Sequence, residues 1–204
     1  QLVNALRGWR KTLPHSHRVF LSFPATRVLQ RALPRPSVTL RDSEQLTWVG
    51  AALARELEMP ADTLCFDYAH DTFSNTFQVT AAQNREVDTL LTLANALRLR
   101  LAAIAPDAGA LANLLSAVAP ARCVAWRDQH QWLWAMRHQW GRRYTTEAAT
   151  VNELAALLAL SPSDIAVFDA ARDPWEAVTL CQPPLPECGA DYTVALALAM
   201  SEAP

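Results

Sequence analysis

Side chains that could act as catalytic bases or metal ligands occur in two histidine motifs and in one short apolar run. His15-Ser16-His17 and His70-Asp71 place imidazoles next to each other or next to a carboxylate, the usual partners in metal sites and general-base catalysis. Both motifs fall in polar segments that predict turns, so we expect solvated loop histidines rather than a metal site. Asp67, between Phe66 and Tyr68, would be a base only if buried, and we expect it on a polar strand face.

Glycine-rich nucleotide-binding loops are absent from the sequence. The chain contains no P-loop and no GxGxxG, HExxH or GxSxG motif, and only 5 of its 204 residues are glycine. Backbone amides approach a phosphate closely where glycine removes the side chain. The sequence therefore excludes nucleotide binding by a glycine-rich loop, and we assign no catalytic, metal-binding or cofactor-binding residue.

The four cysteines do not have the spacing of a zinc site. Such sites use closely paired ligands, whereas only Cys181 and Cys188 are near neighbours, in a proline-rich loop. We expect Cys65 and Cys123 to be buried strand residues and the compartment to be reducing, with a Cys181–Cys188 disulfide as the minor alternative.

Positive charge is concentrated at the start of the chain, although the formal net charge is only −2. Residues 1–41 contain eight basic residues and no acidic residue. Such a segment could contact phosphate, an anionic membrane surface or an acidic protein. We favour the simpler interpretation, in which these residues form a solvated face that the acidic remainder of the chain neutralises.

Aromatic and basic residues are interleaved between residues 126 and 143, as in proteins that bind single-stranded nucleic acid. Bases could stack on Trp126, Trp132, Trp134 or Trp140, and four arginines lie in the same segment. However, Trp132-Leu133-Trp134 makes both faces of the predicted strand apolar, which indicates burial. We therefore expect these tryptophans in the core and no direct nucleic-acid binding.

Composition and periodicity predict one mixed α/β protein. The chain is 51% apolar and 19% charged, which is enough apolar material for a large core. Helical spacing predicts helices at 2–13, 42–57, 87–97, 107–115, 150–158 and 192–200. Apolar or alternating runs predict strands at 18–23, 28–33, 64–68, 77–81, 101–104, 123–126 and 131–136.

The first residues carry neither an initiator methionine nor the pattern of a signal peptide, so we expect an interior point of a longer chain. No apolar run reaches the length of a membrane span.

Several segments, in a fixed order, resemble the PilM family, the actin-like cytoplasmic proteins of type IV pilus assembly. The similarity extends over essentially the whole chain and is carried by the segments RVFLSFPAT, RALPRP, ARELEMP, FDY, VTAAQ, LRLRLAAIAPDAGAL, DPWEAVTLCQPPLP and ALALAM. The resemblance implies an α/β, actin-like ATPase fold in truncated and degenerate form. Residues 1–120 would be the first lobe, with an inserted subdomain at about 34–104, and residues 121–204 would be a reduced second lobe.

The chain departs from that family at the positions that bind phosphate. The first phosphate-binding hairpin would precede Gln1, and the hairpin of the second lobe reads Ala125-Trp126-Arg127-Asp128 where a typical member has an Asp-Ile-Gly-like loop. Trp and Arg prevent the close backbone approach that Gly allows. The connection at 141–150 is also too short for the outer subdomain of the second lobe. We therefore expect no ATP cofactor and no enzymatic activity.

The resemblance then implies a scaffold that binds the short cytoplasmic tail of a PilN- or HofN-like inner-membrane protein, in a groove between subdomains of the first lobe. The candidate partner-binding residues are Phe23, Arg27, Leu29 and Arg31, because they lie on strands that border the predicted insertion. A peptide could bind there as an added strand or through apolar anchors.

We expect a cytoplasmic protein, peripheral to the inner membrane through this partner, that acts in pilus assembly or DNA uptake. The alternatives are a vestigial ATPase and, less favoured, a single-stranded nucleic-acid binder.

Overall fold

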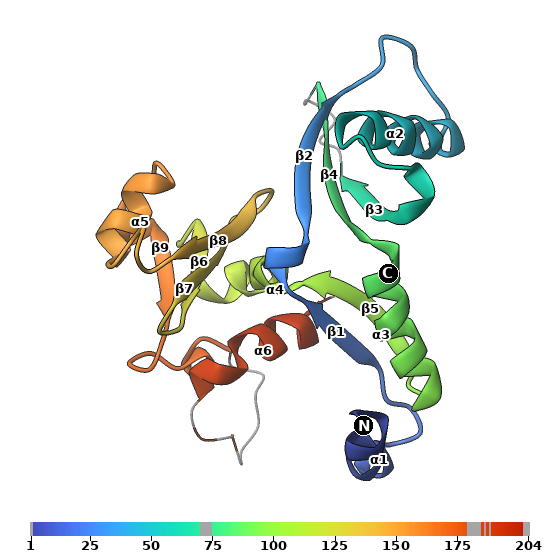
Figure 1. Cartoon of the computed structure of the whole chain (residues 1–204). Coiled ribbons are helices and arrows are strands. Elements are labelled where there is room, and N and C mark those ends of the chain that lie inside the picture. Colours follow the sequence, from blue (N-terminus) through green and yellow to red (C-terminus); the bar gives the residue numbers. More distant parts are fainter. Residues whose placement is uncertain (1, 70–74, 179–184, 186, 188, 202–204) are drawn as a thin grey trace. The chain divides into compact units, whose positions relative to one another are not determined.

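The computed structural model describes residues 2–69, 75–178, 185, 187 and 189–201. These residues form two compact units, one from residues 1–17 and 27–100 and the other from residues 18–26 and 101–204. Both units contain helices and strands, which confirms the prediction of a mixed α/β protein (Figure 1). His70, Asp71, Cys181 and Cys188 lie outside the described residues, and with them the expected turn histidine and the alternative disulfide.

The first unit is built on a three-stranded antiparallel sheet. Its elements are α1 (Leu2–Thr12), β2 (Leu29–Pro34), α2 (Asp42–Glu56), β3 (Leu64–Ala69), β4 (Thr76–Gln83) and α3 (Asn84–Ala96), with the short 3-10 helices η1 (Ala25–Arg27) and η2 (Ala61–Thr63). The strand order is β2-β4-β3, with β4 in the centre. The helices and strands that periodicity predicted in this part of the chain are confirmed.

Alternation along the strands gives this sheet one apolar face. Register places Leu33 opposite Phe77 and Phe66 opposite Ala81, so their side chains share a face. This face packs against α2 in one hydrophobic cluster that contains Leu33, Val49, Ala52, Leu53, Leu64, Phe77, Val79 and Ala81. The opposite face carries exposed residues, so the sheet is covered on one side only.

Two residues on that opposite face were the subject of sequence predictions. Asp67 is exposed, as expected for a polar strand face. Cys65 was expected to be buried, and this prediction was wrong. Cys65 alternates with the inward-facing Leu64 and Phe66, so its thiol lies on the same face as Asp67.

The segment that follows α1 is fixed by a buried histidine. His17 is only 7% exposed, its Nδ1 lies 2.7 Å from the carbonyl oxygen of Pro14, and its Nε2 accepts a hydrogen bond from the backbone N–H of Arg100 at 3.1 Å. The prediction of a solvated loop histidine is therefore wrong for His17, although His15 is exposed. Because a carbonyl can only accept, Nδ1 carries the proton and the neutral ring satisfies both backbone groups.

The second unit contains a two-stranded and a four-stranded sheet. In the first, β1 (Val19–Phe23) pairs in parallel with β5 (Leu101–Pro106). In the second, β8 (Trp140–Tyr144), β7 (Gln131–Ala135) and β6 (Cys123–Arg127) are antiparallel, and β9 (Ile165–Phe168) runs parallel to β6. Sequence patterns did not predict β8 and β9. The remaining elements are α4 (Asp107–Ala110), η3 (Leu111–Val118), α5 (Val151–Leu157), η4 (Pro162–Asp164), η5 (Pro174–Glu176), η6 (Gly189–Tyr192) and α6 (Thr193–Ala199).

Both faces of the four-stranded sheet are buried at its strands β6, β7 and β9, whereas the edge strand β8 is partly exposed. Val124 and Leu133 pack with Leu111, Leu114 and Leu196 on one face. The other face holds a cluster of Cys123, Ala125, Trp132, Trp134, Leu154 and Ala155. Trp132, Trp134 and Cys123 are buried as predicted, with the two tryptophans 1% and 8% exposed, whereas Trp126 and Trp140 are half-buried and pack against the core.

The expected lobe boundary at residue 120 does not coincide with the division between the two units. Residues 101–120 belong to the same unit as residues 121–204, because β5 pairs with β1 and η3 packs against β6. The assignment of residues 1–120 and 121–204 to two actin-like lobes stays a prediction. Among the described residues, no helix combines the length and the apolar character needed to cross a membrane.

Candidate functional site

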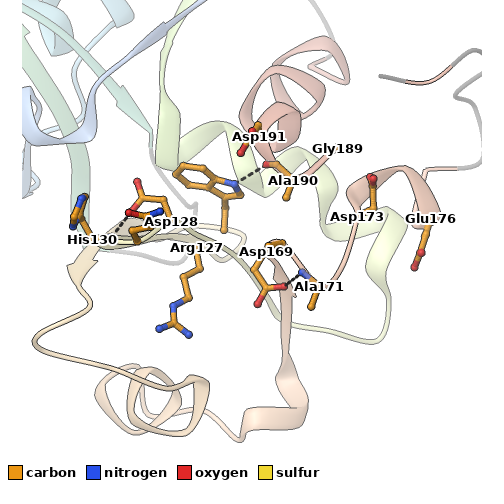
Figure 2. A pocket seen from close by; sticks show the side chains of 13 residues that line it. Arg127, Asp128, His130, Asp169, Ala171, Asp173, Glu176, Gly189, Ala190 and Asp191 are labelled. Atoms are coloured by element: carbon orange, nitrogen blue, oxygen red, sulfur yellow. Dashed lines mark hydrogen bonds between the residues drawn. The ribbon is translucent and has the colours of Figure 1, made fainter. Parts of the chain in front are cut away.

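A cavity of about 970 Å³ opens beside the β6–β7 hairpin of the second unit. Its walls are the hairpin turn, the turn that follows β9, the start of η5 and the start of η6 (Figure 2). It is the position at which the PilM resemblance implies the phosphate loop of the second lobe. The cavity is therefore the place to ask whether this chain can hold a nucleotide.

The hairpin turn is capped by its own aspartate. Oδ1 of Asp128 accepts hydrogen bonds from the backbone N–H groups of His130 and Gln131, both at 2.7 Å, and Oδ2 accepts one from the Gln131 amide at 3.3 Å. Asp and Asn side chains stabilise turns in this way without glycine. The amides that would face a phosphate in a glycine-rich loop are thus already occupied by a carboxylate.

Two further carboxylates in the cavity also cap turns. Asp169 accepts a hydrogen bond from the N–H of Ala171, and Asp173 accepts one from the N–H of Trp175, both at 2.9 Å. On the remaining wall, the indole N–H of Trp126 donates to the carbonyl oxygen of Ala190 at 2.7 Å and ties β6 to η6. Trp126, which is half-buried, is therefore held in place by a partner within the same unit.

Charge in this cavity is predominantly negative. Five carboxylates line it, from Asp128, Asp169, Asp173, Glu176 and Asp191. Glu176 and Asp191 are exposed and accept no hydrogen bond from any described residue. The guanidinium of Arg127 lies over the Trp132 ring, 4.9 Å from its centroid. Like charges repel, so these carboxylates disfavour an anionic group placed beside them.

The cavity also lacks a ready metal site. In the described parts of the chain, no group of three His, Cys, Asp or Glu side chains is placed so that it could hold a metal ion. The five carboxylates are spread over four turns rather than focused on one point.

The four predicted partner-binding residues are divided between the units. Phe23, at the end of β1, is 5% exposed and belongs to the second unit, so its side chain is not available to line an open groove. The other three belong to the first unit. Leu29 is 40% exposed, Arg27 forms an ion pair with Glu86 at 2.7 Å, and Arg31 forms one with Glu56 at 3.0 Å.

Sequence analysis did not single out Asp107, the first residue of α4, as a candidate titratable group. Its Oδ1 accepts hydrogen bonds from the N–H groups of Ala25 and Ala108, at 2.9 and 2.6 Å. Burial raises the pKa of Asp107, and the two hydrogen bonds and the charge of Arg142 oppose this shift only in part. Nothing local in the sequence reveals the contact with Ala25, because the two residues are far apart along the chain.

The chain was compared with known proteins. No protein-family model matches it. The DNA utilization protein HofM of Escherichia coli (strain K12) is 47% identical over 205 residues, which cover 100% of this chain and 79% of that protein.

A solved structure has a similar fold: the cytoplasmic domain of EpsL, an inner membrane component of the type II secretion system of Vibrio cholerae. The TM-score is 0.62 at 13% sequence identity, and the match covers 98% of this chain and 80% of that one. At this identity the similarity defines the fold alone. The identity to HofM, which extends over the whole chain, places this protein in the HofM family of DNA utilization proteins.

Proposed function

We propose that this protein is a non-enzymatic scaffold of a type IV pilus-like or DNA-uptake system, and that it binds the cytoplasmic tail of a PilN- or HofN-like inner-membrane protein. The observation that carries the proposal is the 47% identity to a DNA utilization protein over the whole chain. The fold shared with the cytoplasmic domain of an inner-membrane secretion component supports a place beside a membrane-anchored partner. An actin-like architecture, as the PilM resemblance implies, is part of this proposal.

The cavity chemistry supports a role without nucleotide. Asp128 occupies the amides of the hairpin turn, and four other carboxylates surround the space that a triphosphate would need. A scaffold needs neither the phosphate cradle nor a catalytic base. We therefore assign the role of this protein to its binding surfaces rather than to catalytic turnover.

The edge of the first unit's sheet is the surface that best suits a peptide tail. In the described part of the chain β2 pairs only with β4, so β2 is an edge strand, and an edge strand can accept a further strand through its backbone. Leu29 is exposed on this strand and would serve as an apolar anchor. The pairs of Arg27 with Glu86 and Arg31 with Glu56 are partly exposed and weak enough to exchange for an acidic group of the tail.

Calorimetric titration with a synthetic peptide of the partner's cytoplasmic tail, with and without magnesium-ATP, tests this proposal. We expect saturable binding that ATP leaves unchanged. Leu29→Asp should abolish binding, because it places a charge at the apolar anchor. Leu157→Asp is the matched control, since Leu157 is an exposed leucine of α5 in the other unit.

Two outcomes would contradict the proposal. A clear ATP signal without peptide binding would favour the vestigial ATPase. Equal loss of binding in both leucine variants would show that the β2 edge is not the tail-binding surface.

A further inference from the structure

A second cavity, in the first unit, is lined by basic side chains. It has a volume of about 550 Å³ and lies between α1 and the C-terminal end of α3, which are adjacent in Figure 1. Arg7, Arg10 and Lys11 of α1 and Arg98 after α3 line it, together with Ala96 and Leu97. None of the described residues that line this basic cavity is acidic.

Of the four basic side chains that line the cavity, only Arg10 forms a hydrogen bond with a described residue. Nε of Arg10 donates to the carbonyl oxygen of Leu97 at 3.1 Å, and Leu97 is the C-cap of α3. A cation is stabilised there by the unpaired carbonyls and the negative end of the helix dipole. Arg10 therefore attaches α1 to the end of α3.

The other three cations have no partner within the described chain. Arg7, Lys11 and Arg98 are exposed, and their side chains form no hydrogen bond or ion pair with a described residue. Arg27 and Arg31, from the same basic segment, are neutralised by Glu86 and Glu56. Like charges so close together raise the energy of the protein unless an anion lies between them.

The backbone around Arg98 is held in one conformation. Arg98 has φ of 52°, and the turn is closed by hydrogen bonds from the N–H of Arg98 to the Asn95 carbonyl at 3.0 Å and from the N–H of Leu99 to the Ala94 carbonyl at 2.9 Å. This is the usual left-handed end of a helix. The backbone from which the Arg98 side chain extends to the cavity is therefore fixed.

We propose that the basic cavity binds a phosphate ester that carries at least two negative charges. Guanidinium groups bind phosphate oxygens through two parallel hydrogen bonds, and lysine adds a mobile point charge. A volume of about 550 Å³ exceeds what an inorganic phosphate fills, so the cavity leaves room for a ligand with a further body beside Ala96 and Leu97. An anionic phospholipid headgroup and a soluble phosphate ester share this chemistry.

The test uses the whole chain and two matched double variants. Arg7→Gln with Lys11→Gln removes two cavity charges and leaves Arg10 in place. Arg55→Gln with Arg85→Gln removes the same charge from exposed positions of α2 and α3 outside the cavity. Circular dichroism of both variants checks that they are folded.

Two ligands separate the two sources of phosphate. Cosedimentation with phosphatidylcholine vesicles, with and without phosphatidic acid, whose phosphate monoester can carry two negative charges, measures binding to a lipid headgroup. Calorimetric titration with glycerol 3-phosphate measures binding to a soluble ester. Binding in either arm supports the proposal if the cavity variant weakens it by about tenfold or more and the control variant keeps it.

Three results would overturn the proposal. The first is that neither ligand binds, and the second is that both double variants weaken binding equally. The third is that single-stranded DNA binds more tightly than either ligand and that the cavity variant abolishes this binding, which would assign the cavity to nucleic acid. Tail-peptide binding at β2 serves as an internal reference. The cavity variant should leave it unchanged, so failure of this inference is distinguishable from failure of the scaffold proposal.

Discussion

At the scale of single residues, Asp107 is the carboxyl group whose ionisation the fold disfavours. Its pKa is raised chiefly by burial, so the folded state binds a proton more tightly than the unfolded state does. Below the unfolded pKa the group is protonated in both states and costs nothing. As the pH rises through the folded pKa, a buried carboxylate forms and the free energy of unfolding falls.

Asp107→Asn should therefore stabilise the protein at neutral pH and should have little effect near pH 3, below the usual pKa of an aspartate. The amide oxygen can still accept from Ala25 and Ala108, while the buried charge is gone. Urea unfolding as a function of pH measures the effect, with Asp88→Asn as the control at an exposed site of α3. A loss of stability at neutral pH would show that the two hydrogen bonds to the carboxylate outweigh its burial.

The two described cysteines should differ in reactivity because one thiol is exposed and the other is buried. Burial raises the pKa of Cys123 to about 12, so its reactive thiolate is scarce at neutral pH, whereas Cys65 lies on the open sheet face. In a chain with Cys181→Ser and Cys188→Ser, we expect a thiol-specific reagent to label Cys65 at once. Cys123 should react only in denaturant. Labelling of two thiols without denaturant would contradict the burial of Cys123.

At the scale of secondary-structure elements, His17 joins two segments that are distant in sequence. Its ring satisfies the Pro14 carbonyl and the Arg100 N–H, and so holds the residues after α1 beside the residue that precedes β5. His17→Ala would leave both backbone groups without this partner at a buried position.

We expect His17→Ala to lower the free energy of unfolding by roughly 1–3 kcal/mol, as for other buried polar groups that lose a partner. His15→Ala, at an exposed neighbouring position, should change it little. Chemical denaturation of the two variants measures the difference. If both variants lost the same free energy of unfolding, the hydrogen bonds of the His17 ring would not be what stabilises this turn.

The elements that sequence patterns missed were those with weak local signals. β9 is only four residues long, and β8 reads Trp-Gly-Arg-Arg-Tyr, with no apolar alternation. Among the described strands β8 is an edge strand, and its register beside β7 puts Gly141 opposite Trp134; Arg143 is exposed and Arg142 is half-buried. An edge strand of this kind is specified by its neighbour rather than by its own hydrophobic pattern.

At the scale of the whole molecule, the proposed loss of nucleotide binding predicts how stability responds to ligands. A ligand that binds only the folded state raises the melting temperature by mass action. In the Arg7→Gln, Lys11→Gln variant, which lacks two charges of the basic cavity, magnesium-ATP should leave the melting temperature unchanged, because the carboxylate-lined cavity repels it, while the tail peptide should raise it.

Differential scanning calorimetry with each ligand at a large excess measures both shifts. Adenosine is the matched control without phosphate. A rise with magnesium-ATP but not with adenosine would indicate a phosphate site and would count against the scaffold interpretation.

The sequence alone determined the features that depend on near neighbours. Helical and alternating periodicity located most elements of both units, among them the helix predicted at 150–158, whose start is held by a reciprocal cap of Thr150 and Glu153. Apolar residues on both sides of β7 indicated a doubly covered strand, and Trp132 and Trp134 are buried. These features follow from repeats of two to four residues, which a short stretch of sequence contains in full.

Tertiary structure alone decided the features that depend on distant partners. It neutralised Arg27 and Arg31 with Glu86 and Glu56, and it gathered other cations of the same segment with Arg98 around one cavity. It also buried His17 and placed residues 101–120 with the second unit. Charge and hydrogen bonding act between groups that are close in space, and sequence separation does not reveal which groups will be close.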